Sequence, residues 1–223
     1  LTDKFGCIQF SELSIPDKSS GYTVDDNSRA LIVASLHNKL FNSGESLGLA
    51  RIYLNFLENS QDENGIFKNT FKKIDEGEDV YSEDAFGRAI WALGYTLNKI
   101  DNEEVTEKAR KLFDSSFDNI NKLNSPRAKA YVMNGLYYFY KKNHSEKVVL
   151  KIKEIADFLV ALYKKEASEY WRWFEKYLTY SNSKLPEALF LAYEITKNKE
   201  YLAIAKKTFD FLSGIMFINA QLS

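Results

Sequence analysis

Tyr81-Ser82-Glu83-Asp84-Ala85-Phe86-Gly87-Arg88-Ala89-Ile90-Trp91-Ala92-Leu93-Gly94 is the stretch around which the rest of the chain is organised. It opens a predicted helix over residues 84–100, and Arg88 is the one charge in the three turns after its acidic start. A helix this apolar must be buried over most of its circumference. Its start nevertheless carries the carboxylates Glu83 and Asp84, and an indole, Trp91, follows two turns later. The stretch therefore predicts a core helix with a polar N-terminus.

Composition narrows the class of protein. The chain has 223 residues, of which 45% are apolar and 27% charged, which is typical of a soluble globular protein. The formal net charge is -1, so the chain lacks the excess of positive charge that typically binds nucleic acid or an anionic membrane. No apolar run approaches the roughly 20 residues of a membrane helix. We therefore expect neither nucleic acid nor membrane as a partner; oligomeric state and compartment stay open.

The residues that usually hold metals are scarce. Cys7 is the single cysteine, so no internal disulfide or thiolate metal site can form. His37 and His144 are far apart in the chain and lack ligand spacing. We expect no metal and no cofactor.

Apolar periodicity predicts an all-α chain after an extended or looped segment over residues 1–24. The predicted helices cover residues 27–42, 46–60, 84–100, 103–121, 126–141, 146–165, 186–197 and 199–214.

These helices alternate in character. The odd ones are nearly free of charge in their interiors, whereas the even ones have a polar face. Such alternation indicates an inner ring wrapped by an outer ring, a stack of helical hairpins that closes toward a toroid. We expect one domain over residues 1–223 with about four of six hairpins present, incomplete at its C-terminus.

In a toroid the loops before the inner helices gather at one end, together with the positive ends of the helix dipoles. Polar clusters precede or open each inner helix, and an aromatic segment, 170–175, comes just before the last. The clusters are Asp25-Asp26-Asn27 with Arg29, Glu83-Asp84 with Arg88, Ser125 with Arg127, and Tyr180-Ser181-Asn182.

Each cluster has a structural and a functional interpretation. Asp26 or Asn27, Ser82 or Asp84, and Ser125 are ordinary N-cap residues, each stabilising a helix by roughly 1 kcal/mol. The arginines could simply neutralise the acids, and the tryptophans could be ordinary packing. One cap needs only one side chain, however, and a Trp-x-Trp pair in a charged loop is costly to expose without a ligand. Both interpretations stay open.

The four motifs, in this order, resemble those of a largely uncharacterised family of (α/α)-toroid proteins. They are the segments 21–31, 82–94, 125–128 and 171–189. That family is similar to the six-hairpin glycosidase superfamily, and its members occur alone or fused to glycosyltransferase domains. The resemblance spans nearly the whole chain and implies a helical toroid that acts on carbohydrate. The family pattern also continues with further helices and an acidic motif absent from this sequence.

Three hypotheses follow. The first is a glycoside hydrolase-like enzyme, which needs two carboxylates across the scissile bond. Its candidate catalytic residues are Asp26, Asp84 and Glu175, and its candidate substrate-binding residues are Asp25, Asn27, Arg29, Glu83, Arg88, Trp91, Arg127, Trp171, Trp173, Tyr180 and Asn182. The second is a non-catalytic carbohydrate-binding or accessory domain of a glycosyltransferase. The third is a structural helical array, which predicts an exposed apolar concave face instead of an acidic, aromatic one.

Overall fold

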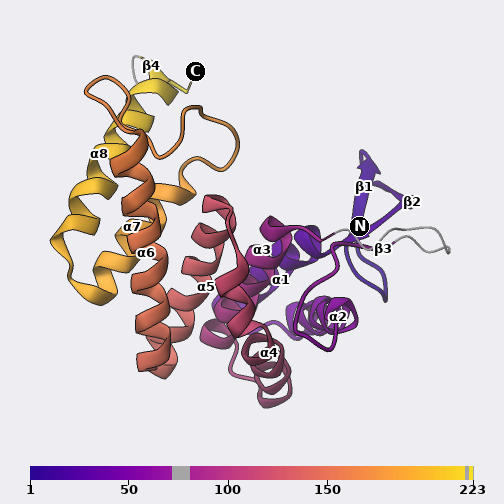
Figure 1. Ribbon diagram of the computed structural model, residues 1–223. Helices are drawn as coiled ribbons and strands as arrows, with labels where there is room; N and C mark the ends of the chain where they lie inside the picture. The colour runs from indigo at the N-terminus through magenta and orange to yellow at the C-terminus, as the bar shows by residue number, and fades with distance from the viewer. Residues whose placement is uncertain (72–80, 219–220, 223) are drawn as a thin grey trace.

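The computed structural model describes residues 1–71, 81–218 and 221–222, and its helices pair into consecutive hairpins (Figure 1). Within these residues the eight predicted helices are confirmed, and a 3-10 turn, Phe117–Lys122, follows the fourth. The helices are α1 (Val24–Phe41), α2 (Gly44–Ser60), α3 (Glu83–Lys99), α4 (Glu103–Ser116), α5 (Pro126–Asn143), α6 (Glu146–Glu166), α7 (Lys184–Thr196) and α8 (Lys199–Met216).

The hairpins form two layers. In the inner layer α1 packs on α3, α3 on α5 and α5 on α7, while α2, α4, α6 and α8 each pack outside their own partner. Burial follows the same division from α3 onward: 11 of the 17 residues of α3 are buried, against five of the 14 of α4. In the first hairpin it does not, because six of the 18 residues of α1 are buried, against seven of the 17 of α2. The predicted alternation of buried and half-exposed helices is therefore confirmed for α3 to α8 and wrong for the first hairpin.

The inner helices α3 and α5 approach very closely because glycines meet where they cross. A Cβ atom built on Gly94 would lie 2.1 Å from the carbonyl oxygen of Gly135. A Cβ atom on Gly135 would lie 2.3 Å from the carbonyl oxygen of Ile90 and 3.0 Å from the Cα atom of Trp91. No side chain fits into these spaces, so the two backbones are in direct contact.

The first 24 residues are more ordered than the sequence indicated. Strands β1 (Ile8–Glu12) and β2 (Ile15–Thr23) form an antiparallel hairpin, and β3 (Thr70–Phe71) pairs with the end of β2. A second short pair, β4 (Phe217–Ile218) and β5 (Gln221–Leu222), follows α8. These strands lie at the ends of the array and leave its all-α architecture unchanged.

The prediction of where α1 begins was wrong by three residues. Its N-cap is Thr23, whose hydroxyl accepts a hydrogen bond from the Asp26 backbone N–H. The acids Asp25 and Asp26 therefore occupy the first turn, where the helix dipole favours them. Ser82 is the N-cap of α3 and Ser125 is the N-cap of α5; both residues were among the predicted N-caps.

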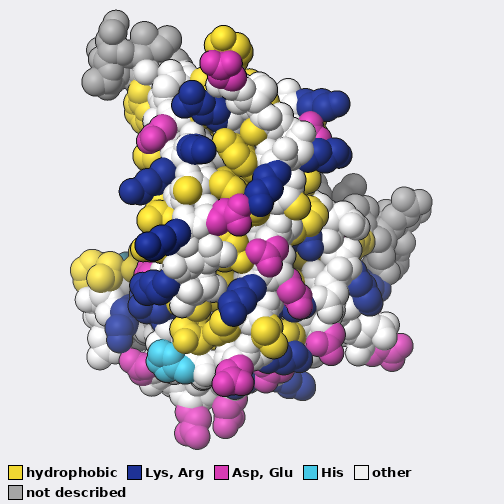
Figure 2. Space-filling model, turned by 60° about the vertical axis from the view of Figure 1, so that its left-hand side comes forward, with side chains coloured by type: hydrophobic (Ala, Val, Ile, Leu, Met, Phe, Trp, Pro, Cys, Tyr) yellow, Lys and Arg dark blue, Asp and Glu magenta, His cyan; other side chains and the backbone are white. Residues whose placement is uncertain are grey.

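The face of the molecule drawn in the space-filling view (Figure 2) is mixed in charge. On the face shown in Figure 2, lysine and arginine side chains are interspersed with acidic ones among small apolar areas. Over the described part of the chain, no helix is both long enough and apolar enough to span a bilayer.

Candidate functional site

The candidate residues gather where the inner helices begin. Helices α1, α3 and α5 bring their capped N-termini to this end, and the loop of residues 167–183, here called the rim loop, arrives from α6 before α7 starts. The side chains fall into two groups, which are described in turn.

The first group bridges α1 and α3. The Asp25 carboxylate contacts Arg29 at 3.2 Å and also pairs with Arg88 of α3. Asp26 accepts from Arg29 and from the Thr23 hydroxyl, both at 2.6 Å. Burial disfavours the charge on Arg88, but hydrogen bonds to Tyr131 and Asp25 outweigh this effect and raise its pKa above the ordinary value. The group therefore has alternating, mutually neutralising charges.

Asn27 does not face this group of charges. Its side chain is fully buried, and its amide oxygen accepts the Cys7 backbone N–H at 2.8 Å. Its amide nitrogen donates to the carbonyl oxygens of Thr23 at 2.9 Å and Cys7 at 3.3 Å. Asn27 thus joins the N-terminal segment to α1, which is a structural task.

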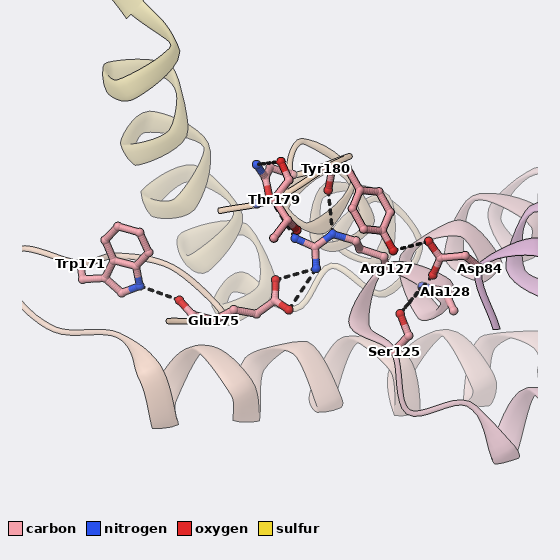
Figure 3. Close-up of polar contacts among 9 residues, drawn as sticks. Asp84, Ser125, Arg127, Ala128, Trp171, Glu175, Thr179 and Tyr180 are labelled. Atoms are coloured by element: carbon pink, nitrogen blue, oxygen red, sulfur yellow. Dashed lines mark hydrogen bonds and ion pairs between the residues drawn. The ribbon is translucent and has the colours of Figure 1, made fainter. Parts of the chain in front are cut away.

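The second group bridges α3, α5 and the rim loop. Glu83 accepts the backbone N–H groups of Asn124 at 2.8 Å and Ser125 at 2.6 Å, so it orders the turn before α5. Asp84 accepts the Ser125 hydroxyl at 3.2 Å on one oxygen and the Tyr180 hydroxyl at 2.7 Å on the other. Both Asp84 oxygens are therefore held by hydroxyl groups (Figure 3).

Tyr180 links this carboxylate to solvent. The residue is 54% exposed, yet burial of its hydroxyl end and the hydrogen bond to Asp84 raise its pKa to about 12. The phenol consequently stays protonated and remains a donor at neutral pH.

Arg127 is the buried centre of the second group (Figure 3). Its guanidinium donates to both Glu175 oxygens at 3.0 and 2.7 Å and to the Asn182 side-chain oxygen at 3.0 Å. It also donates to the Tyr180 carbonyl oxygen at 2.7 Å and lies 5.0 Å from the centroid of that ring. Every one of these partners belongs to the rim loop.

The three tryptophans have different surroundings. Trp91 is partly exposed, stacks parallel to Tyr131 with the ring centroids 6.2 Å apart, and has the Lys184 ammonium 4.0 Å from its ring centroid. Trp171 is partly buried and donates to the Glu175 carbonyl oxygen at 2.6 Å. Trp173 is fully buried beside Phe174 and Phe211. The prediction of a sugar platform was therefore wrong for Trp173, whose ring is part of the core.

Two residues of the site escaped the sequence prediction. Tyr131 accepts from Arg88 at 2.9 Å and stacks on Trp91, and Lys184 lies over the same indole. The signal for Tyr131 was available, because it follows Arg127 at the i+4 spacing with which Arg88 follows Asp84. Lys184 is the first residue of α7, two residues before the predicted start of that helix at Pro186, and it was not singled out within the motif 171–189.

The site is recognised by the side chains described above, since the described residues hold no metal cluster: no group of three or more potential metal ligands occurs among them. Two grooves of about 360 Å³ each lie elsewhere, one at the C-terminal ends of α1 and α3 and one between α1 and α2, and neither is lined by a candidate residue.

Comparison with known proteins gives structural likeness only. No protein-family model matches the chain, and no curated protein matches its sequence. The whole chain superimposes on a D-mannose isomerase (13% identity, TM-score 0.76, 68% of that protein covered) and on a sugar epimerase from a ruminal bacterium (16%, 0.76, 69%).

A GH76 alpha-mannanase of Bacteroides thetaiotaomicron matches 88% of the chain at 18% identity, with a TM-score of 0.65 and 62% of that protein covered. At such low identities these likenesses establish the architecture. The chain has the (α/α)-toroid fold of these structures.

Proposed function

We propose that this chain is a carbohydrate-active protein that binds a neutral sugar along the partly exposed face of α3. The observation that carries the proposal is the alignment of Asp84, Arg88 and Trp91 at i, i+4 and i+7, which places them on one helix face. They extend over about 10 Å of helix axis. That length suits one or two pyranose rings.

Trp91 and Asp84 offer chemistry that a sugar uses, while Arg88 is engaged by Asp25 and Tyr131. The partly exposed Trp91 indole would present a flat apolar surface to the C–H face of a pyranose once the Lys184 ammonium, 4.0 Å from its ring centroid, moves aside. Asp84 accepts two hydroxyl groups, one on each oxygen, and a carboxylate has about four acceptor sites, so the hydroxyls of a sugar can be accepted beside those of Tyr180 and Ser125.

Charge at this end of the molecule favours a neutral ligand. Six carboxylates face four cationic side chains, and most of them are paired with one another. An anionic sugar would therefore find each of these four cations already paired with a carboxylate. The residues are Asp25, Asp26, Glu83, Asp84, Glu175 and Glu187, with Arg29, Arg88, Arg127 and Lys184.

The first candidate activity is glycoside hydrolase-like. Asp26 and Asp84 lie in the first turns of neighbouring inner helices, so the two carboxylates would flank a ligand that lies across α1 and α3. One would protonate the leaving oxygen while the other, ionised, would act as base or nucleophile. The structural neighbours include a mannanase, which supports a reaction on sugars.

The second candidate is binding without catalysis. The specific observation in its favour is that each predicted catalytic carboxylate already has partners: Thr23 and Arg29 for Asp26, two hydroxyls for Asp84, and Arg127 for both oxygens of Glu175. A general acid must hold a proton, and pairing with a cation opposes this.

Calorimetric titration with D-mannose, cellobiose and an α-linked mannan oligosaccharide tests the proposal, with chromatography of the same mixtures for products. We expect saturable binding of at least one sugar, weakened about tenfold in Asp84→Asn and unchanged in Asp114→Asn on the surface of α4. Products lost in both Asp26→Asn and Asp84→Asn support hydrolysis; binding without products supports the second candidate. Wild-type protein that binds none of the three sugars, or full binding by Asp84→Asn, contradicts the proposal.

A further inference from the structure

We infer that Arg127 is a positioning residue that latches the rim loop onto α5 and thereby holds the Tyr180 hydroxyl on Asp84. The inference rests on the proposed function for its consequence, sugar binding, but its geometry stands independently. It also assigns Glu175 and Asn182 to the latch, so neither contacts a ligand directly.

The first step of the argument is burial. The Arg127 side chain is 5% exposed and that of Glu175 is 14% exposed, and both Glu175 oxygens accept hydrogen bonds from the guanidinium, so the two charges are engaged with each other. A guanidinium that is removed from water must have its donors satisfied within the protein. Arg127 meets this requirement through four hydrogen bonds, all to the rim loop.

The second step is the distribution of these bonds along the loop. Glu175, Tyr180 and Asn182 span the second half of the rim loop, a segment without helix or strand. Asn182 in turn accepts from the Thr179 backbone N–H at 3.2 Å and donates to the Thr179 carbonyl oxygen at 3.2 Å. One buried side chain therefore fixes the path of a stretch that has no backbone ladder of its own.

The third step connects the latch to the site. Arg127 Nε binds the carbonyl oxygen of Tyr180, and its guanidinium lies against the face of the same ring. With the backbone and ring of Tyr180 both fixed, its hydroxyl is directed to Asp84. Without Arg127, Tyr180 would be an exposed loop tyrosine free to rotate, and Asp84 would lose its shortest hydrogen bond.

Limited trypsin digestion tests the latch without any ligand, because the rim loop contains the exposed sites Arg172 and Lys176. Cleavage of folded protein follows the population of locally opened molecules. We expect Arg127→Lys, which keeps the charge but cannot make the fork of bonds, to raise the cleavage rate at these two sites by about tenfold. Arg110→Lys, a surface arginine paired with Asp114 on α4, is the matched control and should leave the rate unchanged.

Because Arg127→Lys could compromise the whole fold, Asn182→Ala provides a milder test: it removes one of the four Arg127 hydrogen bonds, together with the two that Asn182 makes to Thr179. It should raise loop cleavage about threefold while the melting temperature stays within a few degrees of wild type. Unchanged cleavage in both variants, or cleavage that rises only in step with global unfolding, overturns the inference.

A second readout separates positioning from direct contact with the sugar. If Arg127 acts through Tyr180, the double variant Arg127→Lys/Tyr180→Phe should bind the panel sugars no more weakly than the worse single variant. Losses that multiply would show that Arg127 touches the ligand itself and would contradict the inference. If wild-type protein binds no sugar of the panel, the proposed function fails, and loop cleavage alone decides for or against the latch.

Discussion

The contact between α3 and α5 gives the sharpest prediction about the fold, the substitution Gly135→Ala. The added Cβ atom would lie 2.3 Å from the Ile90 carbonyl oxygen, and real Cβ contacts essentially never fall below 3.0 Å. The two helices must therefore separate by at least about 0.7 Å at their crossing. Since overpacking typically costs about 1–3 kcal/mol, and alanine recovers up to about 1 kcal/mol of helix propensity, we expect a net loss of roughly 1–2 kcal/mol.

Gly48→Ala is the matched control. Gly48 lies within α2, and a Cβ atom built on it meets nothing within 4 Å. The same change should there stabilise the protein by up to about 1 kcal/mol. Urea denaturation measures both free energies of unfolding, and for a chain of this length the thermal midpoint should move by roughly 2–4 °C per kcal/mol. If Gly135→Ala proved as favourable as Gly48→Ala, the close approach of the two helices would be refuted.

Three further expectations concern single side chains. Trp91→Ala should weaken binding of the panel sugars about tenfold in calorimetry, whereas equal affinity would remove the indole from the site. Asn27→Ala should lower the free energy of unfolding by about 2–4 kcal/mol in urea, because buried backbone groups of Cys7 and Thr23 lose their partner; a loss below about 0.5 kcal/mol would contradict this. Burial and the hydrogen bond to Asp157 raise the pKa of Tyr201 to about 12, whereas an unfolded tyrosine ionises near pH 10. The stability that results is therefore present below about pH 10 and is lost as the pH rises toward 12, and this loss should be smaller in Tyr201→Phe.

The helical architecture could be predicted from the sequence because apolar periodicity and charge content are local properties of each helix. The nearly charge-free helix beginning at Asp84 and the polar one after it are confirmed as an inner and an outer helix. The start of α1 was placed too late because Thr23 and Asp26 exchange reciprocal hydrogen bonds that several neighbouring polar residues could equally have made. The N-terminal strands were not identified as strands, since a stretch such as Asp17-Lys18-Ser19-Ser20 lacks apolar alternation.

The sequence predicted the candidate site only in outline. The sequence placed acids and arginines at one end of the inner helices, but partners 48 residues apart, such as Arg127 and Glu175, cannot be matched from spacing. It also could not show that Trp173 enters the core while Trp91 remains partly exposed, because Trp91 lies in a nearly charge-free helix and Trp173 in a charged loop, which indicates the opposite. Those distinctions depend on packing between distant segments.

The central claim, that a sugar binds along α3 beside Trp91, can be tested most directly through the indole N–H signals of the three tryptophans in a ¹H–¹⁵N NMR spectrum. Trp91→Phe assigns the signal of Trp91. On titration with the D-mannose, cellobiose and mannan panel, we predict that the Trp91 signal shifts saturably while that of the buried Trp173 stays in place. If no sugar moves the Trp91 signal, or if the Trp173 signal moves while that of Trp91 does not, the claim is contradicted.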